Sequence, residues 1–129
     1  MPGWLLDSNI IIGILNDTIA LEQLSSNIIT GVPIAGTVFI SAVTVLELYA
    51  LSGMGTAEER TVDAVVAKVP VLPITASIAR QAGILARTRA RGVRTDLLIA
   101  ATALAHDAIL ITNNPRDFKK IVGLKLQTI

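Results

Sequence analysis

Three carboxylic acids stand out because each lies in a stretch of sequence that is otherwise apolar. Asp7 follows the leucine pair at 5–6, Glu47 lies within the run VTVLELYAL, and Asp96 opens the run DLLIAATALA. An ionised carboxylate in such surroundings loses part of its hydration, so it needs a partner. These positions favour a chemical role for the three side chains.

Carboxylates that are brought together at one site repel one another. Two of them about 4 Å apart repel by about 4 kcal/mol at an effective dielectric constant of about 20. None of the three acids has a Lys or Arg as its immediate neighbour in the sequence. A hard divalent cation such as Mg²⁺ or Mn²⁺ would offset the repulsion, because it takes oxygen ligands and leaves room for water and a phosphate. The set therefore predicts metal-assisted hydrolysis of a phosphodiester.

Each of these residues also has a purely structural explanation. Asp7 could cap the helix that follows the first strand, and Asp96 could equally be a helix N-cap. Glu47 is harder to explain in this way, because a Glu inside an apolar helical run needs a partner or a metal. Thr112 and Asn114 alone would be ordinary loop residues. The residues are informative as a set.

Alternating strands and helices predict an α/β fold: a central, mainly parallel sheet of four to five strands, covered by helices on both faces. Strands are predicted at 4–6, 37–41, 71–72, 108–112 and 124–129. Helices are predicted at 9–15, 17–27, 42–51, 56–68, 75–91 and 96–106, with a short helix after Pro115. The predicted helix caps are Ser8 or Asn9, Thr56 together with Glu59, Thr75, and Thr95 or Asp96.

This arrangement brings the unusual polar residues toward one edge of the sheet. Asp7 ends the first strand, and Thr112 to Asn114 end the strand at 108–112. Asp96 falls in the first turn of a helix, and Glu47 lies two turns into the helix after strand 37–41. Because ligands of such sheets bind beyond the carboxyl ends of the strands, we expect the acids to meet there.

The composition predicts one soluble, cytoplasmic domain over residues 1–129. The apolar fraction is 52% and the charged fraction 16%. The charged fraction is below the roughly 25% of typical domains, so a partner is expected to cover some of the surface. The absence of cysteine and the single His106 exclude thiolate and His-rich metal sites. No apolar run approaches the roughly 20 residues that a membrane span needs.

The net charge is only +1, but basic residues gather in two places. The segment 80–94 holds five arginines and no acid, and a second group lies near the C-terminus. A solvated helix face would explain such a segment, but next to an acidic site a nucleic-acid backbone explains it better. The candidate RNA-binding residues are Arg87, Arg89, Arg91, Arg94, Arg116 and Lys119.

Four segments together resemble the PIN-domain family, and within it the VapC-type toxins of toxin–antitoxin pairs. They are LLDSN, VTVLELYAL, RTDLLIAATAL and ILITNNPRDF, in that order along nearly the whole chain. The resemblance implies a PIN-like three-layer α/β/α fold and an endoribonuclease that depends on Mg²⁺ or Mn²⁺. It also implies a homodimer and a small cognate antitoxin that inserts a segment beside the acidic site.

By the same resemblance, Asp7, Glu47 and Asp96 match the three acids of the PIN site and would bind the metal. The fourth position differs, because many relatives have an acid where this chain has Asn114. Asp117, three residues later, is expected to supply the missing charge.

Two polar residues complete the set that the resemblance implies. Thr112 matches a hydroxyl that hydrogen-bonds a site carboxylate, and Asn9 matches the polar residue after the first acid. We expect Asn114 to act as a neutral oxygen ligand or to orient a water. Its presence puts a second metal in more doubt than the first.

Several rival functions remain open from the sequence. A PIN-like module with an incomplete site would bind RNA or a protein without cleaving, and Asn114 keeps this alternative alive. A haloacid-dehalogenase-like phosphatase would need Asp-x-Asp-x-Thr after the first strand, where the chain reads DSNII. A receiver domain would need a central strand ending in Asp, whereas VFIS ends in Ser41. A DNA-directed nuclease would use the same acids.

Overall fold

The structure is a computed structural model, and it describes residues 3–16, 38–88 and 94–128. The helix predicted at 17–27 lies outside these residues. So do Arg89 and Arg91, two of the candidate RNA-binding residues.

One sheet of five parallel strands forms the centre of the fold, in the order β3-β2-β1-β4-β5. The strands are β1 (Trp4–Leu6), β2 (Val38–Ser41), β3 (Val71–Leu72), β4 (Ile109–Thr112) and β5 (Lys125–Thr128). Strand β1 lies in the middle, because its apolar residues are covered on both faces and suit no edge. The predicted α/β class and the mainly parallel sheet are confirmed.

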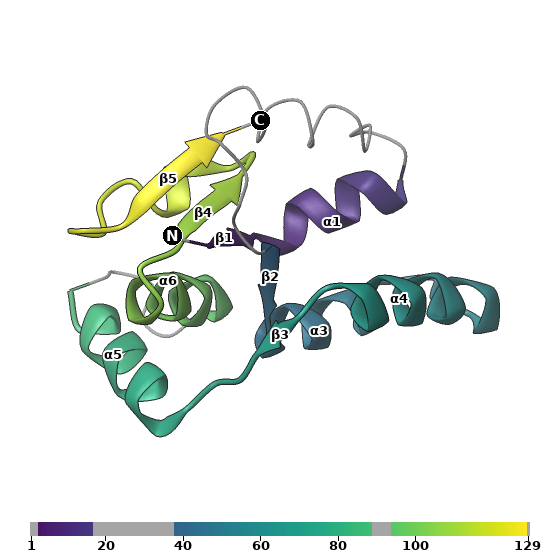
Figure 1. The fold of residues 1–129 in the computed structure, drawn as a ribbon, viewed down its shortest axis with the longest axis horizontal. Coiled ribbons are helices and arrows are strands. Elements are labelled where there is room, and N and C mark those ends of the chain that lie inside the picture. Colours follow the sequence, from purple (N-terminus) through teal and green to yellow (C-terminus); the bar gives the residue numbers. More distant parts are fainter. Residues whose placement is uncertain (1–2, 17–37, 89–93, 129) are drawn as a thin grey trace.

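Helices pack on both faces of this sheet (Figure 1). They are α1 (Ser8–Leu15), α3 (Ala42–Tyr49), α4 (Thr56–Lys68), α5 (Ala76–Ala86), α6 (Thr95–Ala105) and the 3₁₀-helix η1 (Pro115–Asp117). Side chains alternate across the strands, so each face has its own core. Leu5 and Leu110 contribute to the core beneath α5 and α6, while Trp4, Leu6 and Ile111 contribute to the core beneath α1 and α4.

Helix α5 ends earlier than its sequence predicts. The predicted helix ran to residue 91, but α5 ends at Ala86, and its C-cap is Arg87. The amides of Arg87 and Thr88 donate to the carbonyl oxygens of Ile84 and Leu85, three residues back. The Thr88 hydroxyl also donates to the Leu85 oxygen at 3.0 Å. These shorter bonds tighten the last turn and end the α-helix.

Of the predicted helix caps, Thr75 is confirmed, those of α4 and α6 are wrong, and α1 is capped by Asp7, one of the candidates. Thr75 caps α5, because its hydroxyl accepts from the Ile78 amide at 3.2 Å. The N-caps of α4 and α6 each lie one residue before the predicted position, at Gly55 and Arg94. Helix α1 is capped by Asp7 rather than by Ser8 or Asn9. Asp7 therefore both ends β1 and begins α1.

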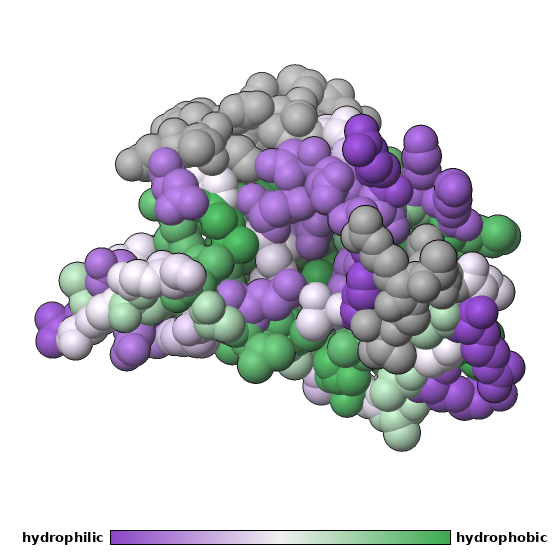
Figure 2. All heavy atoms as spheres, turned by 180° about the vertical axis from the view of Figure 1, so that it is seen from behind, coloured by the Kyte–Doolittle hydropathy of each residue, from purple (hydrophilic) through white to green (hydrophobic). Residues whose placement is uncertain are grey.

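The surface carries hydrophobic residues in several separate groups on the face drawn in Figure 2. Among the described residues, the most exposed large hydrophobic side chains are Leu46, at 62%, and Val122, at 93%. Among the described helices, none has the length and apolar character that crossing a membrane requires.

Candidate active site

The order of the strands places a crevice beside Asp7. From β1 the chain proceeds to β2 and β3 on one side, and β4 and β5 lie on the other side. The connections therefore diverge between β1 and β4, and ligands of open parallel sheets bind at such a point. Asp7 follows β1 and Thr112 ends β4, so both residues stand at this crevice.

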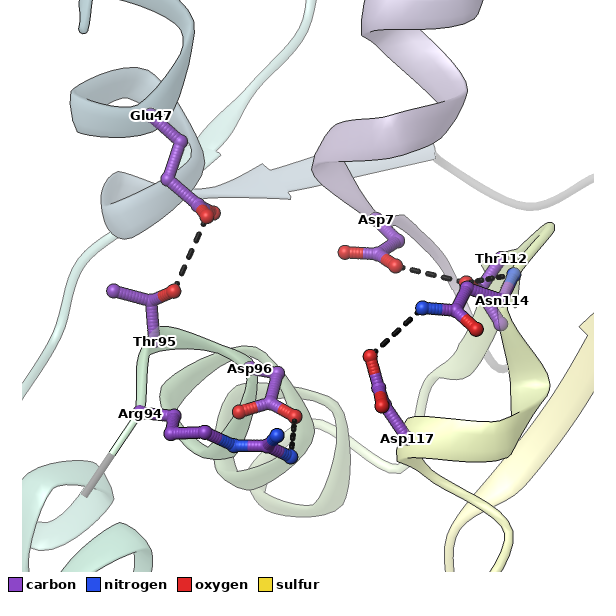
Figure 3. A network of polar contacts seen from close by, with 8 residues as sticks. All are labelled: Asp7, Glu47, Arg94, Thr95, Asp96, Thr112, Asn114 and Asp117. Atoms are coloured by element: carbon purple, nitrogen blue, oxygen red, sulfur yellow. Dashed lines mark hydrogen bonds and ion pairs between the residues drawn. The ribbon is translucent and has the colours of Figure 1, made fainter. Parts of the chain in front are cut away.

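A cleft of about 310 Å³ opens at this edge of the sheet. It brings together the four acids expected from the sequence (Figure 3). Its charged and amide side chains are those of Asp7, Glu47, Asp96, Asp117, Arg94, Asn9 and Asn114. Residues from α1, α3, α6 and η1, which are far apart in the chain, thus share one cleft.

Asp7 is held by two hydrogen bonds and is only 6% exposed. Its Oδ1 accepts from the amide of Ser8 at 2.8 Å, which caps α1. Its Oδ2 accepts from the Thr112 hydroxyl, also at 2.8 Å. The capping explanation is therefore correct for one carboxylate oxygen. Each oxygen still has a lone pair for a further ligand.

The Thr112 hydroxyl is saturated, and this fixes the direction of its proton. Its oxygen accepts from the backbone N–H of Asn114 at 3.0 Å and from the side-chain Nδ2 of Asn9 at 3.4 Å. A hydroxyl has one proton and two lone pairs, so the remaining contact, to Asp7, is the donated one. Thr112 thus holds a carboxylate, as the resemblance implied.

Glu47 is positioned by hydroxyl groups from two other helices. Ser8 Oγ donates to Glu47 Oε1 at 2.6 Å, and Thr95 Oγ1 donates to Oε2 at 3.1 Å. Thr44 is fully buried, and its hydroxyl lies 3.2 Å from that of Ser8. These contacts explain how an acid is retained within the apolar run of α3, and they direct its carboxylate to the cleft.

Asp96 has a basic partner that the sequence analysis did not assign. Arg94 Nη2 lies 2.5 Å from Asp96 Oδ2, and the two side chains are 25% and 17% exposed. No Lys or Arg stands immediately beside Asp96 in the sequence, but Arg94, two residues before it, is its partner in the fold. Arg94, expected only to bind RNA, is part of the acidic cleft itself.

Asn114 and Asp117, the two candidates for the fourth position of the site, both lie in the cleft and contact each other. Asn114 Nδ2 donates to Asp117 Oδ2 at 2.8 Å, and both residues line the cleft. An aspartate at position 114 would lack this donor and would repel Asp117. The amide therefore orients the fourth carboxylate.

The donor set of the cleft suits a hard divalent cation. Carboxylate and amide oxygens are the ligands that Mg²⁺ and Mn²⁺ prefer. Asp96 Oδ1 and Asn9 Oδ1 are buried and, among the described residues, have no hydrogen-bond partner. In the part of the chain that is described, however, no three acids lie close enough together to hold one ion as the side chains stand. A three-carboxylate site therefore requires a side chain to turn.

The pKa of Asp7 reflects its burial and, to a smaller extent, the neighbouring carboxylates. Burial raises this pKa above its ordinary value, and the nearby Glu47 and Asp96 carboxylates raise it further. The hydrogen bonds from Thr112 and Ser8 oppose the shift without cancelling it. Folding therefore favours the protonated form of the Asp7 carboxyl over the ionised form.

We predict that the Asp7→Asn variant gains stability relative to the wild type as pH rises in the presence of EDTA. A raised folded-state pKa means that Asp7 stabilises the fold most below 3.8, its ordinary pKa, and loses this contribution as pH rises toward the folded-state pKa. Urea unfolding of both proteins across this range measures the difference. A variant that loses relative stability as pH rises would show that the ionised carboxylate stabilises the fold.

The other basic candidates that the structure describes, Arg87, Arg116 and Lys119, do not line the cleft. Arg116 in η1 and Lys119 after it are exposed, next to Asp117 and Phe118, which line the cleft. Arg87 is exposed at the end of α5.

Sequence reasoning missed the hydroxyl donors of the site. Ser8 and Thr95 were expected only as helix caps, yet each donates to Glu47. Their signal in the sequence was their position immediately beside Asp7 and Asp96. Thr44, one turn before Glu47 in an otherwise apolar helix, gave a similar signal.

The family model of the PIN domain matches residues 4–124 of the chain. The chain therefore belongs to the PIN-domain family, which confirms the resemblance stated from the four segments. Ribonuclease VapC1 from Rickettsia felis is 53% identical over 34 residues, which are 26% of this chain and 25% of that protein. The match thus spans a quarter of that relative's length.

Solved structures of toxin–antitoxin proteins have the same fold. The chain is similar to one in VapBC-1 from nontypeable Haemophilus influenzae, with 26% identity and a TM-score of 0.79 over 97% of this chain and 96% of that one. It is also similar to a chain in the structure of VapBC2 from Rickettsia felis bound to a DNA fragment from its promoter. The identity is 25% and the TM-score is 0.77, over 98% of both chains. A chain in a toxin–antitoxin complex from Klebsiella pneumoniae is 26% identical, with a TM-score of 0.70 over 95% of both chains.

Proposed function

We propose that the protein is an endoribonuclease that hydrolyses RNA phosphodiesters with Mg²⁺ or Mn²⁺, and that it is the toxin of a VapBC-type pair acting in the cytoplasm. The observation that carries the proposal is the meeting of four carboxylates in one cleft at the carboxyl edge of the sheet. Membership of the PIN family and the name of the Rickettsia relative, a ribonuclease, support the same reaction.

The residues of the cleft have distinct proposed roles. Asp7 and Asp96 bind the cation, and Asp117 completes the acidic set, oriented by Asn114. Glu47 either joins them or accepts a proton from the attacking water, because each of its oxygens keeps a lone pair beyond the hydroxyl contact. When bound, the cation would lower the pKa of a water and offset charge on the reacting phosphate.

The proposal is tested by incubating end-labelled RNAs with purified protein, free of antitoxin, in Mg²⁺, Mn²⁺ or EDTA. We expect cleavage with either metal and none with EDTA. Cleavage that persists in EDTA would contradict the metal dependence. Single-stranded DNA in a parallel reaction separates a ribonuclease from a nuclease that accepts both substrates.

We predict that Arg116→Gln weakens RNA binding similarly for all sequences, because exposed arginines next to the cleft contact the phosphate backbone. The slope of log affinity against log salt concentration should fall by about 1 for one lost phosphate contact. Fluorescence anisotropy in EDTA, which prevents cleavage, measures both. Lys68→Gln is the matched control, because Lys68 is exposed at the end of α4 and does not line the cleft. Equal effects of the two substitutions would argue against an RNA-binding role for Arg116.

The proposed partners are an antitoxin and a second copy of the chain. The solved complexes to which the chain is similar are toxin–antitoxin assemblies, which supports the antitoxin. The exposed Leu46 and Val122, together with the low charged fraction, support a surface that a partner covers. Light scattering of the purified chain, alone and with its antitoxin, would give both stoichiometries.

A second candidate function is RNA binding without cleavage. It is favoured by one observation: within the described residues no three acids are close enough together to hold an ion. RNA binding together with no cleavage in any metal would support this candidate.

A further inference from the structure

Arg94 occupies an unusual position, because it is the one basic residue among the described side chains that line the acidic cleft. It precedes α6 as its N-cap residue and makes no side-chain capping bond there. Its guanidinium instead turns into the cleft and pairs with Asp96 (Figure 3). The Arg94 side chain therefore contacts an acid of the cleft and does not cap the helix.

The contact between Arg94 and Asp96 uses only part of each group. Nη2 meets Oδ2 at 2.5 Å, while Arg94 Nε and Asp96 Oδ1 are buried and, among the described residues, have no partner. Arginine and carboxylate groups frequently meet through two parallel hydrogen bonds. Here an oxygen of the acid and a nitrogen of the base are left without a hydrogen bond, and both are buried.

Charge explains why Arg94 pairs with Asp96. Asp7, Glu47, Asp96 and Asp117 line the same cleft, and among the described side chains that line it Arg94 is the positive one. A divalent cation that binds Asp96 offers the same compensation with twice the charge. The guanidinium and the cation are therefore competitors for one carboxylate.

We propose that Arg94 acts as an internal counterion that the divalent cation must displace from Asp96, and that the displaced guanidinium then binds a phosphate of the RNA. The inference rests on the proposed function, since it assigns Asp96 to the metal. Arg94 lowers the affinity for metal in the absence of RNA, and metal binding in turn strengthens the contact with RNA. Because such coupling is reciprocal, RNA also strengthens metal binding.

The test measures Mn²⁺ binding to the full chain by isothermal titration calorimetry without RNA. Arg94→Gln removes the competing charge, so we expect it to bind Mn²⁺ roughly tenfold more tightly than the wild type. Arg94→Lys keeps a cation that can pair with Asp96, and its affinity should lie between the two. Arg80→Gln is the matched control, because Arg80 is exposed on α5 and does not line the cleft, and it should bind as the wild type does.

Unchanged or weaker Mn²⁺ binding by both Arg94 variants would overturn the inference while leaving the proposed metal site intact. Absence of Mn²⁺ binding in every protein, wild type included, would overturn the proposed function as well. Circular dichroism confirms that each variant is folded before titration. If Arg94→Gln does not fold, Arg94→Lys alone decides: binding stronger than the wild type supports competition, and equal or weaker binding refutes it.

RNA affinity supplies a second, independent measurement. Adding Ca²⁺, a hard cation used here to occupy the site, should strengthen binding of a short RNA to the wild type severalfold and have little effect on Arg94→Gln. An equal effect of Ca²⁺ on both proteins would show that the guanidinium is not released toward the phosphate.

Discussion

Replacing Asp7 by Asn is expected to reduce RNA cleavage by a factor on the order of 10³ or more. Asp7 is the most central of the acids, because it follows the middle strand β1 and is fixed by Ser8 and Thr112. An amide can keep the helix cap through its oxygen but cannot supply the negative charge that a cation needs. Single-turnover cleavage of a labelled RNA measures the loss.

The matched control for this change is Asp107→Asn, which removes the same charge at an exposed position. Asp107 pairs with Lys125 at 2.9 Å and has a positive φ of 49°, a conformation that Asn tolerates well. The Asp107→Asn variant should cleave RNA at the same rate as the wild type. If Asp7→Asn unfolds at a much lower temperature, or cleaves normally, then Asp7 is a structural residue rather than a ligand.

Phe118→Ala is expected to cost about 3–5 kcal/mol of folding free energy. Phe118 is 2% exposed, packs into the core beneath α5 and α6, and also lines the cleft. Truncating this side chain leaves a cavity in the core, at the position that follows Asp117 in the chain. The expected loss of folding free energy is a large part of the roughly 5–15 kcal/mol that stabilises a domain. Urea unfolding measures the change.

Phe118→Leu is the appropriate comparison, since it keeps an apolar side chain and should cost clearly less than alanine. We also expect Phe118→Ala to impair cleavage at temperatures where the variant is still folded. The buried Phe118 ring follows η1 directly, so its loss should let η1 and Asp117 shift away from the cleft. A variant as stable as the wild type would show that Phe118 does not contribute to the core.

The sheet could be predicted from the sequence because its strands are short continuous apolar runs. Trp4–Leu6 and Ile109–Thr112 are buried on both faces, which leaves a parallel arrangement as the natural choice. Once the sheet is parallel, the polar residues after these strands must meet at one edge. Asp7 and Thr112 were placed together for this reason, and they share a hydrogen bond.

The details of the site depend on contacts between residues that are distant in sequence. Ser8 and Thr95 stand beside Asp7 and Asp96 in the sequence, but this position does not indicate that they donate to the two oxygens of Glu47 on another helix. Arg94 was grouped with the basic segment, because its turn toward Asp96 depends on where α6 begins. The caps of α4 and α6 were misplaced by one residue because Gly55 and Arg94 make no side-chain capping bond that a capping preference could predict.

The measurement that tests the central claim most directly is an anomalous-scattering map from crystals of the protein grown with Mn²⁺. Our account predicts a manganese peak in the cleft, within coordination distance of Asp7 and Asp96, with the Arg94 guanidinium turned away from Asp96. A map from well-ordered crystals with no manganese in the cleft, or with manganese bound only elsewhere, would contradict the assignment of these carboxylates to a metal.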